Sequence, residues 1–335
     1  MAEIFGYLPD GRAVERVRLQ AGRLSAHVLT LGAIVQDLRL AGVAHPLVLG
    51  AEDLAPYLGS MQYFGAMVGR CANRIANGQM VLDGQRYQLA RNVPGGHCLH
   101  GGALGSAAQL WSVTAHEADQ VTLALTLPDG EMGFPGTLTL RLRIALQGTA
   151  LAFDIHATTD KPTLCNFSHH GFFTLDDSGS LAHHSLQIAA ESYLPVDDDQ
   201  IPTGEIAPVA GTPFDFRAER SLSGVALDHN FCLSHARGPL RDRACLRSAH
   251  SGLVMQMQTT EPGLQVYTAN HLPKPDARGP GGRPFGRHAG IALEAQVWPD
   301  AVNQTGFPSA ILRPGEVYHQ QTRYRFSRGG SAAWA

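Results

Sequence analysis

One carboxylate and two histidine motifs form the most informative set of residues in this 335-residue chain. Glu294 carries the only charge in an apolar, strand-like run at residues 290–296. Upstream, His100 precedes a Gly-Gly pair, and His170 is the second member of a His-His pair. A carboxylate accepts a proton, and an imidazole near its unperturbed pKa supplies one. The three residues therefore predict proton-transfer chemistry at neutral pH.

A second set of polar residues is of the kind that holds a small hydroxylated ligand. Asn73 and Arg74 lie close to Arg70 beside a glycine, and such groups grip hydroxyls or an anion. Asp228 and Gln265 can also bond to hydroxyls, and Gln265 faces away from its apolar neighbours in an alternating run. Each has a structural alternative: a salt-bridged loop for the arginines, and turn chemistry for Asp228.

The histidines have alternatives as well. His97-x-x-His100 has the spacing of a metal pair, but no nearby cysteine or carboxylate completes a ligand set, so no metal is expected. In a Gly-rich turn, His100 could also be structural. Successive side chains of a strand face opposite ways, so at most one of His169 and His170 points into a given pocket, and the other packs in the core. The pair at 183–184 is expected at the surface.

The elements that must position these residues are predicted to be strands. Apolar residues alternate with polar ones at 121–127, 138–146 and 151–155, and 37 glycines and 20 prolines punctuate such runs. An Asp-Gly pair inside 81–87 predicts a hairpin, and 53–59 a short helix. The prediction is an all-β fold, a large antiparallel β-sandwich. Residues 274–287, rich in Pro and Gly, are interpreted as a surface loop, which leaves 1–335 as a single domain.

Composition excludes several classes of protein. The net charge is −3 without a basic patch, so no nucleic acid partner is expected. The N-terminus lacks a signal peptide and no segment could span a bilayer, so no membrane partner is expected. Five cysteines without a Cys-x-x-Cys pair favour reduced thiols and a cytoplasmic location. The serine-hydrolase elbow, the P-loop and the dinucleotide fingerprint are all missing.

Ten short motifs, in order along nearly the whole chain, together resemble the galactose mutarotase (aldose 1-epimerase) family. Two of the most specific are Gly-Arg-x-Ala-Asn-Arg-Ile at 69–75 and Leu-His-Gly-Gly at 99–102. The other matching stretches are 63–66, 128–136, 193–197, 201–205, 228–231, 293–296, 298–303 and 312–316. Any one of them would be weak alone.

The resemblance implies a β-sandwich of unusual size and an isomerase that needs neither cofactor nor metal. It would interconvert the α and β anomers of free aldoses such as galactose and glucose, as a monomer or homodimer. It places the catalytic base at Glu294, the acid at His170 and a further catalytic histidine at His100. It places the sugar-binding residues at Asn73, Arg74, Asp228 and Gln265.

One segment departs from the family. The usual Asn-His-Ser-Tyr-Phe-Asn-Leu is His-His-Gly-Phe-Phe-Thr-Leu at 169–175. The histidine at 170 is kept, but a phenol and two amides are lost, which predicts weaker discrimination among aldoses. Three alternatives stay open: a non-catalytic carbohydrate-binding β-sandwich, a sugar-phosphate epimerase on the same fold, and a metal enzyme of the cupin type.

Overall fold

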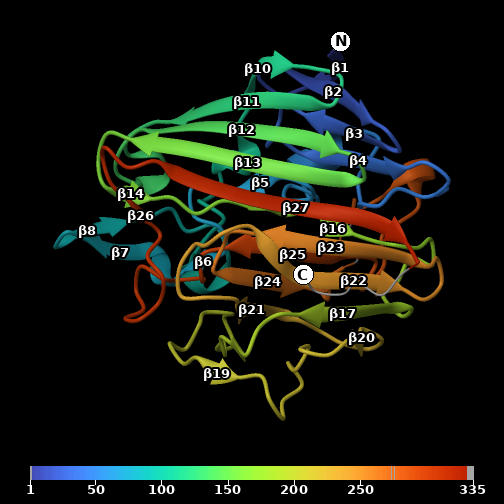
Figure 1. Ribbon diagram of the computed structural model, residues 1–335. Coiled ribbons are helices and arrows are strands. Elements are labelled where there is room, and N and C mark those ends of the chain that lie inside the picture. The colour runs from blue at the N-terminus through green and yellow to red at the C-terminus, as the bar shows by residue number, and fades with distance from the viewer. Residues whose placement is uncertain (1, 273, 275, 330–335) are drawn as a thin grey trace.

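Three antiparallel sheets contain most of the strand residues in the computed structural model, which describes residues 2–272, 274 and 276–329 (Figure 1). The first sheet has the order β1 (Glu3–Tyr7), β2 (Ala13–Ala21), β3 (Leu24–Leu29), β4 (Val35–Leu40). The nine-stranded sheet has the order β10 (Ser112–His116), β11 (Gln120–Leu127), β12 (Leu138–Gln147), β13 (Ala150–Thr159), β27 (Tyr318–Arg328), β23 (Leu253–Thr259), β22 (Arg241–Ser248), β17 (His184–Ile188), β20 (Arg220–Ser221). The six-stranded sheet has the order β16 (Phe172–Phe173), β25 (Ile291–Gln296), β24 (Gly263–Tyr267), β21 (Asp228–Cys232), β18 (Ser192–Tyr193), β19 (Ala207–Pro208).

Short strand pairs and single helical turns make up the other regular elements. The pairs are β14 (Thr163–Leu164) with β26 (Ile311–Leu312), β15 (Ser168–His169) with β5 (Met67–Val68), β6 (Arg74–Ile75) with β9 (Cys98–Leu99), and β7 (Gln79–Leu82) with β8 (Gln85–Gln88). The helical turns of the described chain are all 3₁₀: η1 (Ala55–Leu58), η2 (Ala76–Gly78), η3 (Pro94–Gly96), η4 (Ser106–Ala108), η5 (Glu131–Gly133), η6 (Pro280–Gly282). None of these is long or apolar enough to cross a lipid bilayer.

The sequence predicted this architecture correctly at the level of elements. The three alternating runs form β11, β12 and β13, neighbours in the nine-stranded sheet, and the all-β fold is confirmed. The Asp-Gly hairpin is the β7–β8 pair, where Asp83 and Gly84 both have positive φ (51° and 80°), as a two-residue turn requires. The short helix expected over 53–59 is the 3₁₀ turn η1.

The nine-stranded sheet packs against both of the others, and the core lies between these layers (Figure 1). Two side chains of β27 tie it directly to β25. Tyr324 Oη donates to Leu293 O at 2.8 Å, and Gln320 Nε2 donates to Ala295 O at 3.0 Å. These two bonds come from the nine-stranded sheet, whereas β16 and β24 pair with β25 within its own sheet. The strand that bears Glu294 is therefore fixed from two sides.

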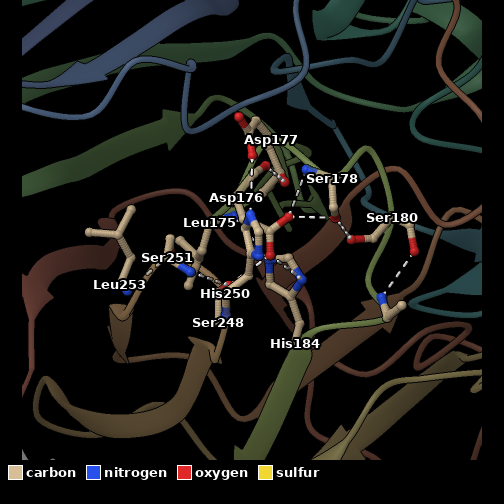
Figure 2. A network of polar contacts seen from close by, with 12 residues as sticks. Leu175, Asp176, Asp177, Ser178, Ser180, His184, Ser248, His250, Ser251 and Leu253 are labelled. Carbon is tan, nitrogen blue, oxygen red and sulfur yellow. Dashed lines mark hydrogen bonds and ion pairs between the residues drawn. The ribbon is translucent and has the colours of Figure 1, made fainter.

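The expectation that the pair at 183–184 lies at the surface is wrong for one of its members. His183 is exposed, whereas His184 begins β17 and is buried. Its Nε2 accepts the N–H of Leu175 at 3.0 Å, and its Nδ1 lies 3.6 Å from Asp176 Oδ2 (Figure 2). Ser248 Oγ donates to the same carboxylate oxygen at 2.7 Å. Strand alternation turns the second histidine inward, and the network anchors the chain that follows β16.

The predicted surface loop at 274–287 is confirmed where the chain is described; Pro275 lies outside the described residues. The segment contains only η6 and one isolated bridge, between Arg278 and Pro284, and most of its residues are exposed.

Candidate active site

A cleft of about 180 Å³ opens on the side of the six-stranded sheet that faces away from the nine-stranded one. Six of the seven residues predicted to form the site line it: Asn73, Arg74, His100, His170, Asp228 and Glu294. The other described residues that line it are Ser60, Tyr63, Phe64, Leu99, Phe172, Tyr267, His271, Leu272 and Lys274.

One wall of the cleft is the sheet itself. Along β25, Ile291, Leu293 and Ala295 pack into the main core, so the alternation of a strand turns Glu294 to the cleft face. Gln265 on β24 is directly opposite Glu294 in the strand register.

Gln265 is buried and is not among the described residues that line the cleft. Its Nε2 donates to Asp228 Oδ1 at 2.7 Å, and Asp228 begins β21 at the edge of the cavity. In this geometry, Gln265 orients the Asp228 carboxylate.

The opposite wall is made of loops, and its first part is a reciprocal contact between Asn73 and His100. The backbone N–H of His100 donates to Asn73 O at 2.9 Å, and the backbone N–H of Asn73 donates to His100 Nδ1 at 3.1 Å. Both residues have positive φ (60° for Asn73 and 52° for His100), which non-glycine residues rarely adopt. Because Nδ1 accepts a hydrogen bond, the neutral His100 ring carries its proton on Nε2.

Close backbone packing holds this wall together. A Cβ atom on Gly101, which has φ +84°, would lie 2.1 Å from Gly69 O. The segment after Asn73 is held by Asp300. The backbone N–H of Asp300 donates to Arg74 O at 3.0 Å, and Asp300 Oδ1 accepts from the N–H of Ala76 at 3.0 Å. The motif at 298–303 thus supports the Asn-Arg segment without reaching the cleft.

His170 completes the loop wall between β15 and β16. Its backbone N–H donates to Ala66 O at 2.8 Å, and its carbonyl accepts from Gly65 at 2.9 Å. Its Nε2 lies 3.7 Å from Glu294 Oε1 across the cleft. His169 points the other way and stacks on Phe153, with ring centroids 4.3 Å apart. The prediction that only one of the two histidines faces the pocket is confirmed.

Aromatic side chains pack around these groups, among them Phe172, which stands where the family motif has a tyrosine, and Tyr63 and Tyr267, whose role the sequence analysis did not predict. The Tyr63 ring lies edge-on to His100, with centroids 4.7 Å apart, and roughly parallel to His170 at 6.1 Å. Phe172 lies 5.1 Å from the His170 ring and 5.8 Å from that of Tyr267. Tyr63 belongs to one of the matching motifs, but an isolated aromatic residue has no spacing signal that separates a cleft wall from a core.

The second arginine of the Gly-Arg-x-Ala-Asn-Arg motif is in the cleft, but the first is not. Arg70 is 2% exposed, and its guanidinium donates to the carbonyls of Leu127, Pro128, Pro135 and Gly136 and to Thr163 Oγ1. It therefore binds the loop at 128–136. The suggestion that both arginines grip a ligand is wrong, because the Arg70 guanidinium is buried against these carbonyls and only Arg74 of the two lines the cleft.

Burial dominates the electrostatics of the site. It raises the pKa of Glu294 well above its usual value; nearby Asp228 adds to the rise, and Arg74 opposes it. Burial lowers the pKa of His170 to about 4, with Lys274 adding to the fall. Burial, His170 and Arg74 hold the pKa of His100 well below its usual value. Without a ligand, each of the three groups is therefore favoured in its neutral form.

The same three groups are close enough to hold a metal ion. One ligand atom from each of His100, His170 and Glu294 lies within 4.8 Å of the others. His97 is directed elsewhere: its Nδ1 accepts from the backbone of Asn77 at 3.0 Å, and its Nε2 lies 3.5 Å from Asp199. The trio thus admits two chemistries, proton transfer or metal ligation, while the polar groups beside it suit a hydroxylated ligand.

Fold and cleft together describe an all-β protein whose cleft brings a carboxyl group, two imidazoles and hydroxyl-binding groups together. A model of the aldose 1-epimerase family matches residues 15–325. The chain is 40% identical to the galactose mutarotase of Bos taurus over 97% of both chains. It is 34% identical to the aldose 1-epimerase of Escherichia coli (strain K12) over 95% of this chain and 96% of that one.

A solved structure agrees with these relatives. A GalM/aldose epimerase homologue from C. elegans superposes with a TM-score of 0.88 at 29% identity, covering 95% of this chain and all of the other. The chain belongs to the aldose 1-epimerase family, and it is an isomerase.

Proposed function

We propose that the protein interconverts the α and β anomers of free aldoses such as galactose and glucose. The observation that carries the proposal is the pair formed by His170 Nε2 and Glu294 Oε1, 3.7 Å apart across a cleft lined with hydroxyl-binding groups. The names of the relatives, galactose mutarotase and aldose 1-epimerase, support the same reaction.

The reaction opens and closes the hemiacetal ring. Glu294 takes the proton of the C1 hydroxyl while His170 gives a proton to the ring oxygen, and the bond between C1 and O5 breaks. Rotation about C1–C2 then presents the other face of the aldehyde to the C5 hydroxyl. Closure reverses both transfers and gives the other anomer. Each positioned acid or base contributes roughly 10²–10⁴-fold to such a rate.

The pKa shifts of the site are compatible with this cycle. Opening the ring requires a Glu294 carboxylate and a protonated His170, and it ends with a neutral carboxylic acid and a neutral imidazole. Both states hold one proton on the pair, because Glu294 gains a proton from the C1 hydroxyl as His170 gives one to the ring oxygen. Ring opening and closure therefore need no net exchange of protons with water. The neutral pair favoured by burial is the form that closes the open-chain sugar.

The remaining groups hold the sugar. Asp228, oriented by Gln265, accepts bonds from hydroxyls of the ring, while Asn73 and Arg74 donate to others. His100 donates through Nε2, the nitrogen that its contact with Asn73 leaves protonated. A donor aimed at the ring oxygen or the C1 oxygen stabilises the charge that develops there.

Two alternatives have weaker support. A sugar-phosphate epimerase needs several cations around a phosphate, but Arg70 is bound to backbone carbonyls, and the described cations that line the cleft are Arg74 and Lys274. A non-catalytic sugar-binding protein would not need a carboxylic acid and an imidazole facing each other at 3.7 Å in a buried site.

The direct test is mutarotation itself. Fresh α-D-galactose is dissolved with and without the protein, and the anomeric protons are followed by NMR. We expect equilibration far faster than in buffer, and a polarimetric panel of aldoses then ranks the substrates. Unchanged equilibration in the presence of folded protein that binds galactose would favour the non-catalytic alternative.

A second test separates proton transfer from metal ligation by His100, His170 and Glu294. We expect the polarimetric rate to survive exhaustive dialysis against a chelator, because the proposed steps use only protein groups. Loss of the rate, with recovery on adding one particular metal, would reject the acid–base mechanism in favour of a metal enzyme.

The partner in this proposal is a small free aldose, with no nucleic acid, no membrane and no cofactor. We also propose a cytoplasmic location, because Cys71, Cys98, Cys165, Cys232 and Cys245 are all unpaired and buried, as in proteins of reducing compartments.

A further inference from the structure

A second cluster of possible metal ligands lies far from the cleft, on the outer face of the nine-stranded sheet. Asp154 and His156 are two residues apart on β13, and His319 is directly opposite His156 on β27. Phe153 and Ile155 face the core, so strand alternation turns all three polar residues outward. Figure 1 shows β13 and β27 side by side in the middle of this sheet.

The three side chains converge on one point. Asp154 Oδ1 lies 2.9 Å from His156 Nε2 and 3.2 Å from His319 Nε2. The two imidazoles are stacked, with centroids 4.3 Å apart and an interplanar angle of 17°. One nitrogen from each ring and one carboxylate oxygen lie within 4.8 Å of one another.

We infer that Asp154, His156 and His319 form a binding site for one divalent cation of the zinc class, separate from the catalytic cleft. Two imidazole nitrogens and a carboxylate oxygen are a ligand set that zinc prefers. With bonds of about 2.0–2.1 Å to such ligands, a tetrahedral ion needs ligand atoms about 3.3 Å apart. The distances from the carboxylate oxygen, 2.9 and 3.2 Å, are close to that value. The two imidazole nitrogens lie within 4.8 Å of each other, and the stacked rings must turn toward each other to share one ion.

The contacts of the other carboxylate oxygen support the site. Gln321 Nε2 donates to Asp154 Oδ2 at 3.0 Å, and Arg143 Nη2 lies 3.6 Å from the same atom. These contacts leave Oδ1 to point between the imidazoles, as partners behind a metal ligand do.

Position in the sheet makes the cluster accessible and rigid. The His156 and His319 side chains are 44% and 45% exposed, so an ion can reach them, and water can complete its coordination. The strands that carry them are hydrogen-bonded on both sides, β13 to β12 and β27, and β27 to β13 and β23. A rigid backbone keeps the three ligands together before the ion arrives, which favours binding.

Calorimetric titration of Zn²⁺ into the full chain at pH 7.5, without a histidine tag, tests the inference. We expect one binding event that weakens at least ten-fold in His156→Asn and in His319→Asn. A matched control is His183→Asn, which removes one ring from another stacked pair, His183 and His250, with centroids 5.4 Å apart. That variant should bind as wild type does. Gln321→Leu should weaken binding about ten-fold, the usual effect of removing a contact behind a ligand.

Mutarotation measured during the titration separates this site from the His100, His170 and Glu294 trio. Filling the sheet site should leave the rate unchanged, since the cluster does not line the cleft. The inference fails if His319→Asn binds Zn²⁺ as tightly as wild type, or if the His183→Asn control loses the event. It also fails if the event that disappears in His319→Asn coincides with inhibition.

Discussion

The two walls of the cleft are built in different ways. Glu294 and Asp228 project from β25 and β21, strands of one hydrogen-bonded sheet, and Gln265 on β24 lies between them. On the other wall, His100 follows the short strand β9, and His170 lies between β15 and β16. Their positions depend on a few local hydrogen bonds, such as the two between His100 and Asn73.

The two walls differ in what fixes the directions of their side chains. On the sheet wall, strand register and alternation set the direction of each side chain, so a conservative change of side chain leaves the backbone in place. On the loop wall, residues with positive φ and close backbone contacts set the direction, so the backbone itself is vulnerable. Substitutions on the sheet wall should therefore separate activity from stability, whereas some on the loop wall should affect both.

The largest effect is expected for Glu294→Gln. The change keeps size and removes the base, so most activity should be lost while the protein stays folded. The pKa of Glu294 is raised in the folded state, so the stability linked to its protonation is present below its unfolded pKa and declines as pH rises toward the folded one. At pH 8 the variant should thus be at least as stable as wild type in urea unfolding. Near-normal turnover would remove Glu294 from the role of base.

Next in size are the two histidines of the loop wall. His170→Asn should lower kcat by roughly two to four decades, the range for a lost general acid. His100→Asn should affect both kcat and KM, because His100 would contact the sugar as well as the developing charge. Steady-state polarimetry measures both constants. If His100→Asn lowers kcat far more than His170→Asn does, the acid role moves to His100.

Gly101→Ala tests the backbone of the loop wall. The new Cβ would lie 2.1 Å from Gly69 O at φ +84°, so something must shift. We expect a loss of about 2–4 kcal/mol in the free energy of unfolding, from strain and displaced backbone together, with lower activity. Gly252→Ala is the matched control, because it has φ +70° with nothing within 4 Å of the new Cβ. It should cost only about 1–2 kcal/mol. Equal losses in urea unfolding would show that packing against Gly69 is unimportant.

The pH dependence of kcat/KM tests His170 and Glu294, which face each other across the cleft from the two walls. Burial lowers the pKa of His170 to about 4 and raises that of Glu294, so the pair holds one proton between these limits. Adding a second proton below about pH 4 should abolish the active form. We expect kcat/KM to fall on acidification with an apparent pKa near 4 rather than near 6.5. An acid limb close to pH 6.5 would contradict this assignment.

The smallest effect is expected for Phe172→Tyr, which restores the phenol that the family motif leads us to expect at this position. Phe172 lines the cleft, with its ring 5.1 Å from His170 and 4.4 Å from Phe64. A site that bonds a given hydroxyl rejects analogues lacking it, so the apolar ring should let fucose and arabinose compete well with galactose. Phe172→Tyr should shift kcat/KM toward galactose. A strong galactose preference in wild type, unchanged in the variant, would show that this segment does not set specificity.

All four residues predicted on the loop wall line the cleft, whereas on the sheet wall Glu294 and Asp228 line it and Gln265 does not. The alternation of apolar and polar residues around Glu294 and Gln265 can be read from neighbouring residues alone, and it predicts which face of the strand each side chain is on. The all-β fold follows from the same periodicity. His169 and His170 were correctly divided by the same rule. Order and spacing of short motifs then placed seven residues in one site, six of which line the cleft.

Tertiary structure decided everything that depends on which chain segments meet. Arg70 and Arg74 share one motif, yet one binds backbone carbonyls and the other lines the cleft. His184 was expected outside and is buried, because β17 is covered by the segment around Asp176. The pKa shifts of Glu294 and His170 also required the fold, since burial is their largest cause. A sequence specifies which groups are available and which way a strand turns them. The distances between these groups, and their removal from water, arise only when the fold packs distant segments of the chain together, such as those that carry His170 and Glu294.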